Sequence, residues 1–259
     1  MTWGSRITFA RLCHEELSRV KERDGIGLYA EKRLHSVLKR WALDDLAHHE
    51  QRIYDREGKR TRYVADVLTP AGEIFEIQTA SLYPMRKKLE FYLEHTDHRV
   101  CVVHPLIANK HVNWMLPDTG EVTARRKSPR HDTALSALGE LKSVLPYLGH
   151  PRFSVCLPAI EVEEFRLLDG WGKGGKRGSH RYEQIPQDLL EVTHLCTRAD
   201  YGALLPHSLP DTFTAKVFAK HTGLRGFALY DALAVFEGLS FVQKCGKEGR
   251  SALYARTEQ

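Results

Sequence analysis

The stretch that decides the fold is a pair of short apolar segments, YVADVL at residues 63–68 and IFEIQ at residues 74–78, joined by the sequence TPAGE. Proline and glycine in the connecting segment favour a reversal of the chain, so the two segments are predicted to form a β-hairpin. One acidic side chain stands on each arm, Asp66 on the first and Glu76 on the second. Carboxylates from neighbouring strands can hold one Mg²⁺ or Mn²⁺, because hard cations take oxygen ligands. The hairpin therefore predicts a metal site.

A helix is predicted on each side of this hairpin. Apolar residues spaced i, i+3, i+4 and i+7 between residues 29 and 42 indicate an amphipathic helix, and one further turn back places Glu31 on its core side. After the hairpin, Pro84 suits the first turn of a second helix, where no N–H is needed. The buried stripe of that helix is predicted to comprise Met85, Leu89, Tyr92 and Leu93. Lys88 then lies near its inward edge.

The remaining elements of the first half predict a mixed sheet flanked by helices. Residues 100–103 (VCVV) form a short apolar run that suits a central strand, and residues 111–116 predict another strand. A helix over residues 133–148 and a strand over 153–160 complete this part, and residues 1–24 predict a helix without an assigned role. The predicted order of helix, hairpin, helix and strand gives an α/β domain over residues 1–165.

The second half is predicted to be mostly helical. A basic glycine-rich hairpin or linker over residues 166–182 separates it from the first domain. Residues 183–259 predict a separate domain with short helices and a terminal hairpin at 241–254. The predicted helices cover residues 189–195, 201–205, 214–222 and 228–239. Helices followed by a glycine-tipped basic hairpin are typical of a winged helix-turn-helix domain.

The motifs resemble the PD-(D/E)XK nuclease superfamily, whose fold is restriction-endonuclease-like. In that superfamily the active site combines a strand Asp, an (Asp/Glu)-X-Lys triplet on the next strand and a helix Glu. The resemblance implies a catalytic set of Asp66, Glu76, Gln78, Glu31 and Lys88. Asp66, Glu76 and the carbonyl of Ile77 would be metal ligands, and Glu31 would bind a second ion or a metal-bound water.

Two positions depart from the superfamily pattern, because Ala65 replaces its proline and Gln78 replaces its lysine. An amide carries no positive charge, although it can still orient water. Lys88 is the candidate for the missing lysine, with Lys87 as the fallback. Several further segments between residues 29 and 256 resemble a bacterial family that pairs such a domain with a C-terminal winged helix.

Basic clusters mark candidate nucleic-acid contacts, because guanidinium and ammonium groups bind phosphate. The candidates are Arg125, Arg126, Lys127, Ser128, Lys173, Lys176, Arg177, Arg181, Arg225, Tyr230, Lys244, Lys247 and Arg250. Solvated charge runs and a solvated linker are the competing interpretations. Residues 170–177 fit only the first part of a phosphate-loop motif, since Arg177 stands where Ser or Thr is required.

The composition indicates where in the cell such a protein is expected to act. Thirty-eight Lys and Arg oppose thirty-three Asp and Glu, and no apolar run reaches the roughly twenty residues of a membrane helix. Five scattered cysteines without a Cys-x-x-Cys pair predict reduced thiols and a cytoplasmic location. The sequence thus predicts a Mg²⁺-dependent DNA endonuclease or DNA-processing protein, with a possible homodimer. The alternatives are a non-cleaving DNA-binding or regulatory protein and a module whose winged helix binds a protein partner.

Overall fold

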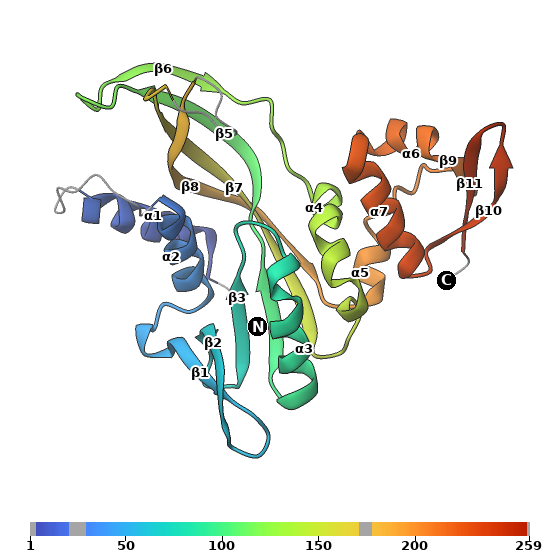
Figure 1. The fold of residues 1–259 in the computed structure, drawn as a ribbon, viewed down its shortest axis with the longest axis horizontal. Coiled ribbons are helices and arrows are strands. Elements are labelled where there is room, and N and C mark those ends of the chain that lie inside the picture. The colour runs from blue at the N-terminus through green and yellow to red at the C-terminus, as the bar shows by residue number, and fades with distance from the viewer. Residues whose placement is uncertain (1–3, 21–29, 171–177, 258–259) are drawn as a thin grey trace.

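The computed structural model describes residues 4–20, 30–170 and 178–257, and within these the side chains of residues 17–20 and 30–32 are left out (Figure 1). An eight-stranded mixed sheet runs through the centre, with helices on both faces. The predicted α/β class, a mixed central sheet flanked by helices, is confirmed. Within the described part of the chain, no helix is both long and apolar enough to cross a membrane.

The predicted hairpin is confirmed. Strands β2 (Arg60–Leu68) and β3 (Glu73–Ile77) are antiparallel, with Val67 opposite Phe75. Gly72 lies in the connecting turn with φ +79°, a left-handed conformation that glycine adopts without a steric penalty. A second hairpin precedes the first, in which β1 (His49–Tyr54) pairs antiparallel with β2.

Parallel pairing begins at β3. The chain leaves β3, forms a short 3₁₀ helix η2 (Tyr83–Met85) and helix α3 (Arg86–His95), and returns as β4 (Arg99–Val103), parallel to β3. The predicted stripe of α3 is buried, because Met85, Leu89, Tyr92 and Leu93 are each at most 6% exposed. Four of the five β4 residues are buried as well, which confirms the predicted central strand.

The longest pairings belong to β7 (Phe153–Leu167). Its first residues pair with β4, its later residues with β5 (Leu106–Met115), and nearly its whole length with β8 (His180–Leu195). Strand β6 (Val122–Lys127) forms the far edge of the sheet, and all six of its residues are exposed. The β7–β8 hairpin and β5–β6 project together beyond the helices in Figure 1.

Strand β8 corrects two predictions. The helix predicted at residues 189–195 is wrong, because this segment pairs antiparallel with β7, and the first sheet extends to Leu195 instead of ending before residue 183. The spacing of apolar residues in this segment also fits a helix. Its conformation is decided by hydrogen bonds to β7, a strand that local sequence patterns do not reveal as its partner. The segment at 166–182 connects two paired strands, as the hairpin interpretation required, with residues 171–177 outside the described part.

Helices cover the sheet on both sides. Helices α1 (Arg6–Val20) and α2 (Ala30–Ala42) pack on one face, and buried Phe9 and Trp41 meet there edge to face. Helix α3 and helix α4 (Ala134–Leu141) cover the other face. The predicted helix at 133–148 ends at Leu141 and continues as the 3₁₀ helix η3 (Lys142–Tyr147), which contains Pro146. A further 3₁₀ turn, η1 (Leu46–His48), links α2 to β1.

The C-terminal unit contains three helices and a small antiparallel sheet of order β10-β11-β9. Its elements are α5 (Arg198–Gly202), β9 (Thr212–Thr214), α6 (Ala215–Thr222), α7 (Gly226–Gly238), β10 (Val242–Glu248) and β11 (Ser251–Arg256). Gly223 ends α6 in the left-handed region, at φ +72°. The predicted break at this glycine and the terminal hairpin are confirmed.

The C-terminal unit shares its core with the sheet domain. Buried Leu138 on α4 and Leu233 on α7 belong to one continuous hydrophobic cluster, which also contains Tyr92 of α3. Helix α7 passes so close to η3 that a Cβ on Gly238 would lie 2.6 Å from a methyl carbon of Leu145. The two parts of the chain therefore pack as one body around α4.

Replacing Leu138 by Ala is expected to lower the free energy of unfolding by about 3 kcal/mol, because a fully buried leucine leaves a cavity. Urea titrations followed by tryptophan fluorescence and far-UV circular dichroism measure this change. Hydrogen exchange should report the same loss of protection in β4 and in α7, since both contribute buried residues to the hydrophobic cluster that contains Leu138. Leu190→Ala, at a residue 40% exposed, is the matched control. A loss confined to α7 would contradict the shared core.

Candidate functional site

Asp66 joins the hairpin to helix α2. Its Oδ2 accepts a hydrogen bond of 2.7 Å from the backbone N–H of Ile77 on the opposite arm. Its Oδ1 lies 3.4 Å from Nε2 of His35, which extends from α2. The Asp66 side chain is 16% exposed, so it lies just beneath the surface with one oxygen on each partner. The carboxylate therefore fixes how α2 is placed against the end of β3.

Glu76 joins the hairpin to helix α3, on the other face of the sheet. It is 1% exposed, and its Oε2 lies 2.7 Å from Nζ of Lys88. The Tyr92 hydroxyl donates a hydrogen bond of 3.0 Å to Oε1. Lys88 and Tyr92 are four residues apart, which places them on the same side of α3. Both oxygens of this buried carboxylate are thus satisfied by one helix.

The two carboxylates differ in their electrostatic environment. Burial raises the pKa of Glu76 to about 7, and the nearby negative charge of Asp66 adds to the rise, although Lys88 opposes it. Burial also tends to raise the pKa of Asp66, but the His35 contact and the Ile77 N–H outweigh it, so the pKa is below its ordinary value. Burial and Glu76 together raise the pKa of Tyr92. Asp66 is therefore the more readily ionised member of the pair.

The structure brings three of the five predicted catalytic side chains together. Lys88 contacts Glu76 directly and lies close enough to Asp66 to act on its charge. The fallback, Lys87, is exposed. Gln78 lies just past β3, where its backbone N–H donates to the Val103 carbonyl and its own carbonyl contacts Nδ1 of His104.

Of the predicted metal-ligating side chains, the structure describes Asp66 and Glu76. Asp66 accepts the Ile77 N–H at the end of the hairpin, and Glu76 precedes Ile77 on β3 with its side chain bound to α3. Glu31 lies in the first turn of α2, and its side chain is outside the described residues. Among the side chains that are described, no group of three or more His, Cys, Asp or Glu is arranged to hold a metal ion.

Sequence reasoning missed two side chains of this cluster. His35 contacts Asp66 and Tyr92 binds Glu76, yet His35 is not among the predicted site residues, and Tyr92 is predicted only as part of the buried stripe of its helix. Helical spacing carries a signal for both. His35 is one turn after Glu31, and Tyr92 is one turn after Lys88.

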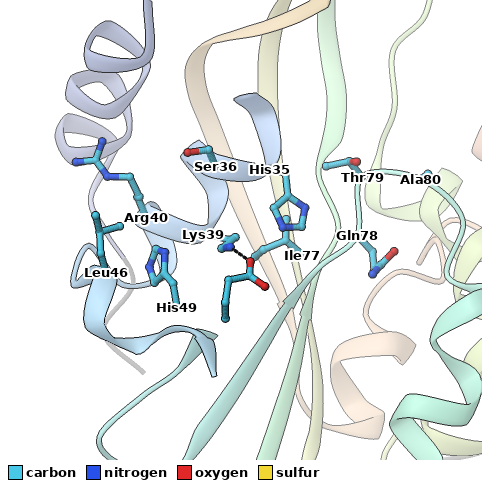
Figure 2. A pocket seen from close by; sticks show the side chains of 11 residues that line it. His35, Ser36, Lys39, Arg40, Leu46, His49, Ile77, Gln78, Thr79 and Ala80 are labelled. Carbon is cyan, nitrogen blue, oxygen red and sulfur yellow. Dashed lines mark hydrogen bonds and ion pairs between the residues drawn. The ribbon is translucent and has the colours of Figure 1, made fainter. Parts of the chain in front are cut away.

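A cavity of about 640 Å³ opens beside Asp66, between α2, the η1–β1 segment and the residues that follow β3 (Figure 2). His35, Ile77 and Gln78 belong to its wall. His35 therefore touches Asp66 and faces the cavity at the same time.

The predicted basic segment at 125–128 forms the exposed edge of the sheet. Arg126, Lys127 and Ser128 border a second cavity of about 630 Å³, which is also lined by Arg130 and His131. Arg125 is paired with Glu163, with Nη2 and Oε1 2.6 Å apart, so it is less available than its neighbours. Arg181 is exposed at the start of β8. Lys173, Lys176 and Arg177 lie outside the described residues.

The predicted contacts of the C-terminal unit lie on α7 and on the terminal hairpin. Arg225 and Tyr230 are exposed at the beginning of α7, while Lys247 and Arg250 are exposed at the hairpin tip. Lys244 forms an ion pair of 3.0 Å with Glu237 of α7. Phe227, which sequence reasoning did not select, is 89% exposed and lies one turn before Tyr230. The outer face of α7 is thus aromatic, and the basic side chains stand at its N-terminus and on the β10–β11 hairpin.

Fold and site together define a mixed α/β protein with an acidic pair on a central hairpin and a helical C-terminal unit. The chain belongs to the family described as "Domain of unknown function (DUF8091)", which matches residues 32–196. An uncharacterized protein of Treponema pallidum (strain Nichols) is 28% identical over 199 residues, which cover 74% of this chain and 75% of that protein. No solved structure matches the chain. The family match ends one residue after β8, where the large sheet ends.

Replacing Glu76 by Gln is expected to change how stability depends on pH. A carboxyl whose folded pKa is raised to about 7 stabilises the fold below its ordinary value of 4.5, and that contribution is lost as pH rises through 7. The amide does not titrate, so the variant should gain stability relative to the wild type between pH 5 and pH 8. Urea titrations in EDTA across this pH range measure the difference in free energy of unfolding between the variant and the wild type. Glu90→Gln, at an exposed position of α3, is the control. A difference in free energy of unfolding between Glu76→Gln and the wild type that stays constant with pH would contradict the raised pKa of Glu76.

Proposed function

We propose that this protein is a metal-dependent DNA endonuclease or DNA-processing protein, with its hydrolytic site at the end of the β2–β3 hairpin. The observation that carries the proposal is the buried Glu76–Lys88 pair, 2.7 Å apart, with Asp66 on the neighbouring strand near enough for its charge to act on Glu76. Phosphodiester hydrolysis needs carboxylate oxygens for a cation and a positive charge near the phosphoryl group. These three side chains are the groups required.

The donor set suits Mg²⁺ or Mn²⁺. Asp66, Glu76 and the Ile77 carbonyl offer the hard oxygen ligands that these ions take, and the side chain of Glu31 is the candidate for another. The Lys88 ammonium already lies 2.7 Å from the Glu76 carboxylate, so the protein itself stabilises positive charge there. A bound divalent ion would polarise the phosphoryl oxygens and lower the pKa of water.

Each neighbouring side chain has a defined part in this proposal. Lys88 supplies the cation that the Glu-X-Gln triplet lacks, since Gln78 can only donate to and accept from water. Tyr92 keeps the Glu76 carboxylate in one orientation through its 3.0 Å hydrogen bond. His35 keeps the Asp66 carboxylate in one orientation, from the other face of the sheet.

The order of elements supports the finer fold assignments within the proposal. Helix α2, the β2–β3 hairpin, α3 and β4 follow one another as expected for a restriction-endonuclease-like core. In the C-terminal unit, a strand precedes two helices and a hairpin, and β9 pairs with the last strand. This arrangement supports a winged helix, in which α7 and the β10–β11 hairpin would contact DNA. A cytoplasmic setting and a homodimer for duplex cutting accompany this proposal.

Two alternatives rest on specific observations. Both oxygens of Glu76 are occupied by Lys88 and Tyr92, an arrangement that also suits a DNA-binding or regulatory protein without turnover. Exposed Phe227 and Tyr230 on α7 favour a protein partner for the winged helix. The nuclease is preferred because carboxylates with strongly shifted pKa values gather at functional sites, and burial raises the pKa of Glu76 to about 7.

Asp66→Asn and Glu76→Gln are each expected to lower DNA cleavage by at least roughly a hundredfold, because each removes a charged oxygen ligand. The assay incubates linear, nicked, branched and single-stranded DNA with Mg²⁺ or Mn²⁺. Lys88→Ala should slow cleavage and leave DNA affinity nearly unchanged. Lys87→Ala, at the exposed neighbour, is the matched control for the change of charge.

The outcomes separate the proposed functions. DNA binding without cleavage, unaffected by the two carboxylate variants, would select the non-cleaving protein. Absence of DNA affinity at low salt would leave the protein-interaction module. Turnover that survives Lys88→Ala would remove Lys88 from the mechanism.

Lys127→Ala on strand β6 is expected to weaken DNA binding uniformly across sequences and to reduce the salt slope by about one unit, since a phosphate contact releases condensed counterions. Fluorescence anisotropy at several salt concentrations measures the slope. Arg125→Ala should have a smaller effect, because that guanidinium is already paired with Glu163. Equal effects of the two substitutions would contradict the assignment of the β6 edge.

A further inference from the structure

The cavity beside Asp66 contains an ion pair at its wall. Lys39 of α2 and Glu50 of β1 both line the cavity, and they are joined to each other, as the dashed line in Figure 2 marks. The Lys39 side chain is 12% exposed, whereas the Glu50 side chain is 63% exposed. The ammonium is thus fixed in the wall, and the carboxylate can turn into solvent.

Glu50 has an unusual backbone. Its φ is +51°, in the left-handed region that residues other than glycine rarely adopt. A strained conformation persists when the surrounding structure enforces it, and such residues gather at functional sites. Here the conformation belongs to the residue whose carboxylate pairs with the lysine of the cavity.

The other charged groups at the cavity are engaged elsewhere. Arg40 pairs with Glu15 and Asp44, and Figure 2 shows its guanidinium directed away from the cavity. His35 contacts Asp66. Lys39 is therefore the lining cation whose partner can be exchanged most easily, because an exposed carboxylate contributes little to an ion pair.

Hydroxyl and apolar groups complete the wall. Thr79, which follows Gln78 after β3, offers a hydroxyl, whereas the Ser36 hydroxyl on α2 donates to Oε1 of Glu16, 3.2 Å away. Leu46, which is 62% exposed, offers an apolar surface at the rim. An ammonium, a hydroxyl and an apolar rim match one phosphate and the adjoining sugar of a nucleic-acid strand.

We propose that this cavity binds a phosphate of the DNA strand next to the one being cut, with Lys39 as its ligand and Glu50 as the competitor that occupies Lys39 in the free protein. The inference rests on the proposed nuclease function and adds a substrate subsite to it. Its location follows from His35, which contacts Asp66 and lines the cavity. A phosphate here would displace Glu50 into solvent.

Opposite effects of the two partners test this assignment. Lys39→Gln is expected to weaken binding of a labelled DNA duplex roughly tenfold, because a charge-assisted hydrogen bond is lost. Glu50→Gln is expected to tighten binding roughly threefold, since it frees Lys39. Fluorescence anisotropy in EDTA measures affinity without cleavage. Lys59→Gln and Glu57→Gln, two exposed positions in the β1–β2 turn, control for the same changes of net charge.

The contrary outcomes are equally defined. If both cavity variants weaken binding, or if each only matches its control, the ion pair is structural and the subsite is overturned. Absence of DNA binding by the wild type in EDTA would also overturn it. Titration of inorganic phosphate alone is a separate arm, and a Lys39-dependent response to phosphate but not to DNA would assign the cavity to a free anion and overturn the strand assignment.

The two proposals can fail separately. Opposite effects of Lys39→Gln and Glu50→Gln in a protein that cuts no DNA would keep the subsite and remove the hydrolase. Cleavage that depends on Asp66 but responds to neither cavity variant beyond its control would keep the hydrolase and remove the subsite. Thermal unfolding of all four variants confirms that affinities are compared between folded proteins.

Discussion

Burial of the Glu76 carboxylate constrains the whole centre of this protein. A charged group that is 1% exposed must be paired or neutralised, and α3 provides both an ammonium and a hydroxyl for it. Those two contacts fix the rotation of α3 over the sheet, because Lys88 and Tyr92 occupy one side of the helix. The same rotation buries Leu89 against the strands. Polar and apolar requirements of α3 are therefore met by a single orientation.

The hairpin links the two faces of the sheet at one point. Asp66 reaches α2 through His35, and Glu76 reaches α3 through Lys88, although the two acids stand on adjacent strands. Parallel pairing of β3 with β4 then ends at Ile77, which leaves the following residues free to line a cavity.

Local patterns in the sequence predicted the parts of the fold that depend on neighbouring residues. The β2–β3 hairpin, the stripe of α3 and the inward position of Lys88 follow from turn chemistry and periodicity. Strand β8 could not be predicted in this way, since β7 and not its own sequence determines its conformation. The contacts of His35 and Tyr92 were missed for a related reason. Helical spacing selects a face, but the partner of that face comes from a distant segment.

Helix α4 determines how the C-terminal unit is placed. It covers the sheet beside α3 and also packs against α7, so the same leucines serve both parts. The family match ends at residue 196, before α5, yet the core crosses that boundary without interruption. A shared core restricts motion far more than a linker does. Packing at α4 consequently sets the position of the outer face of α7 relative to the end of the β2–β3 hairpin.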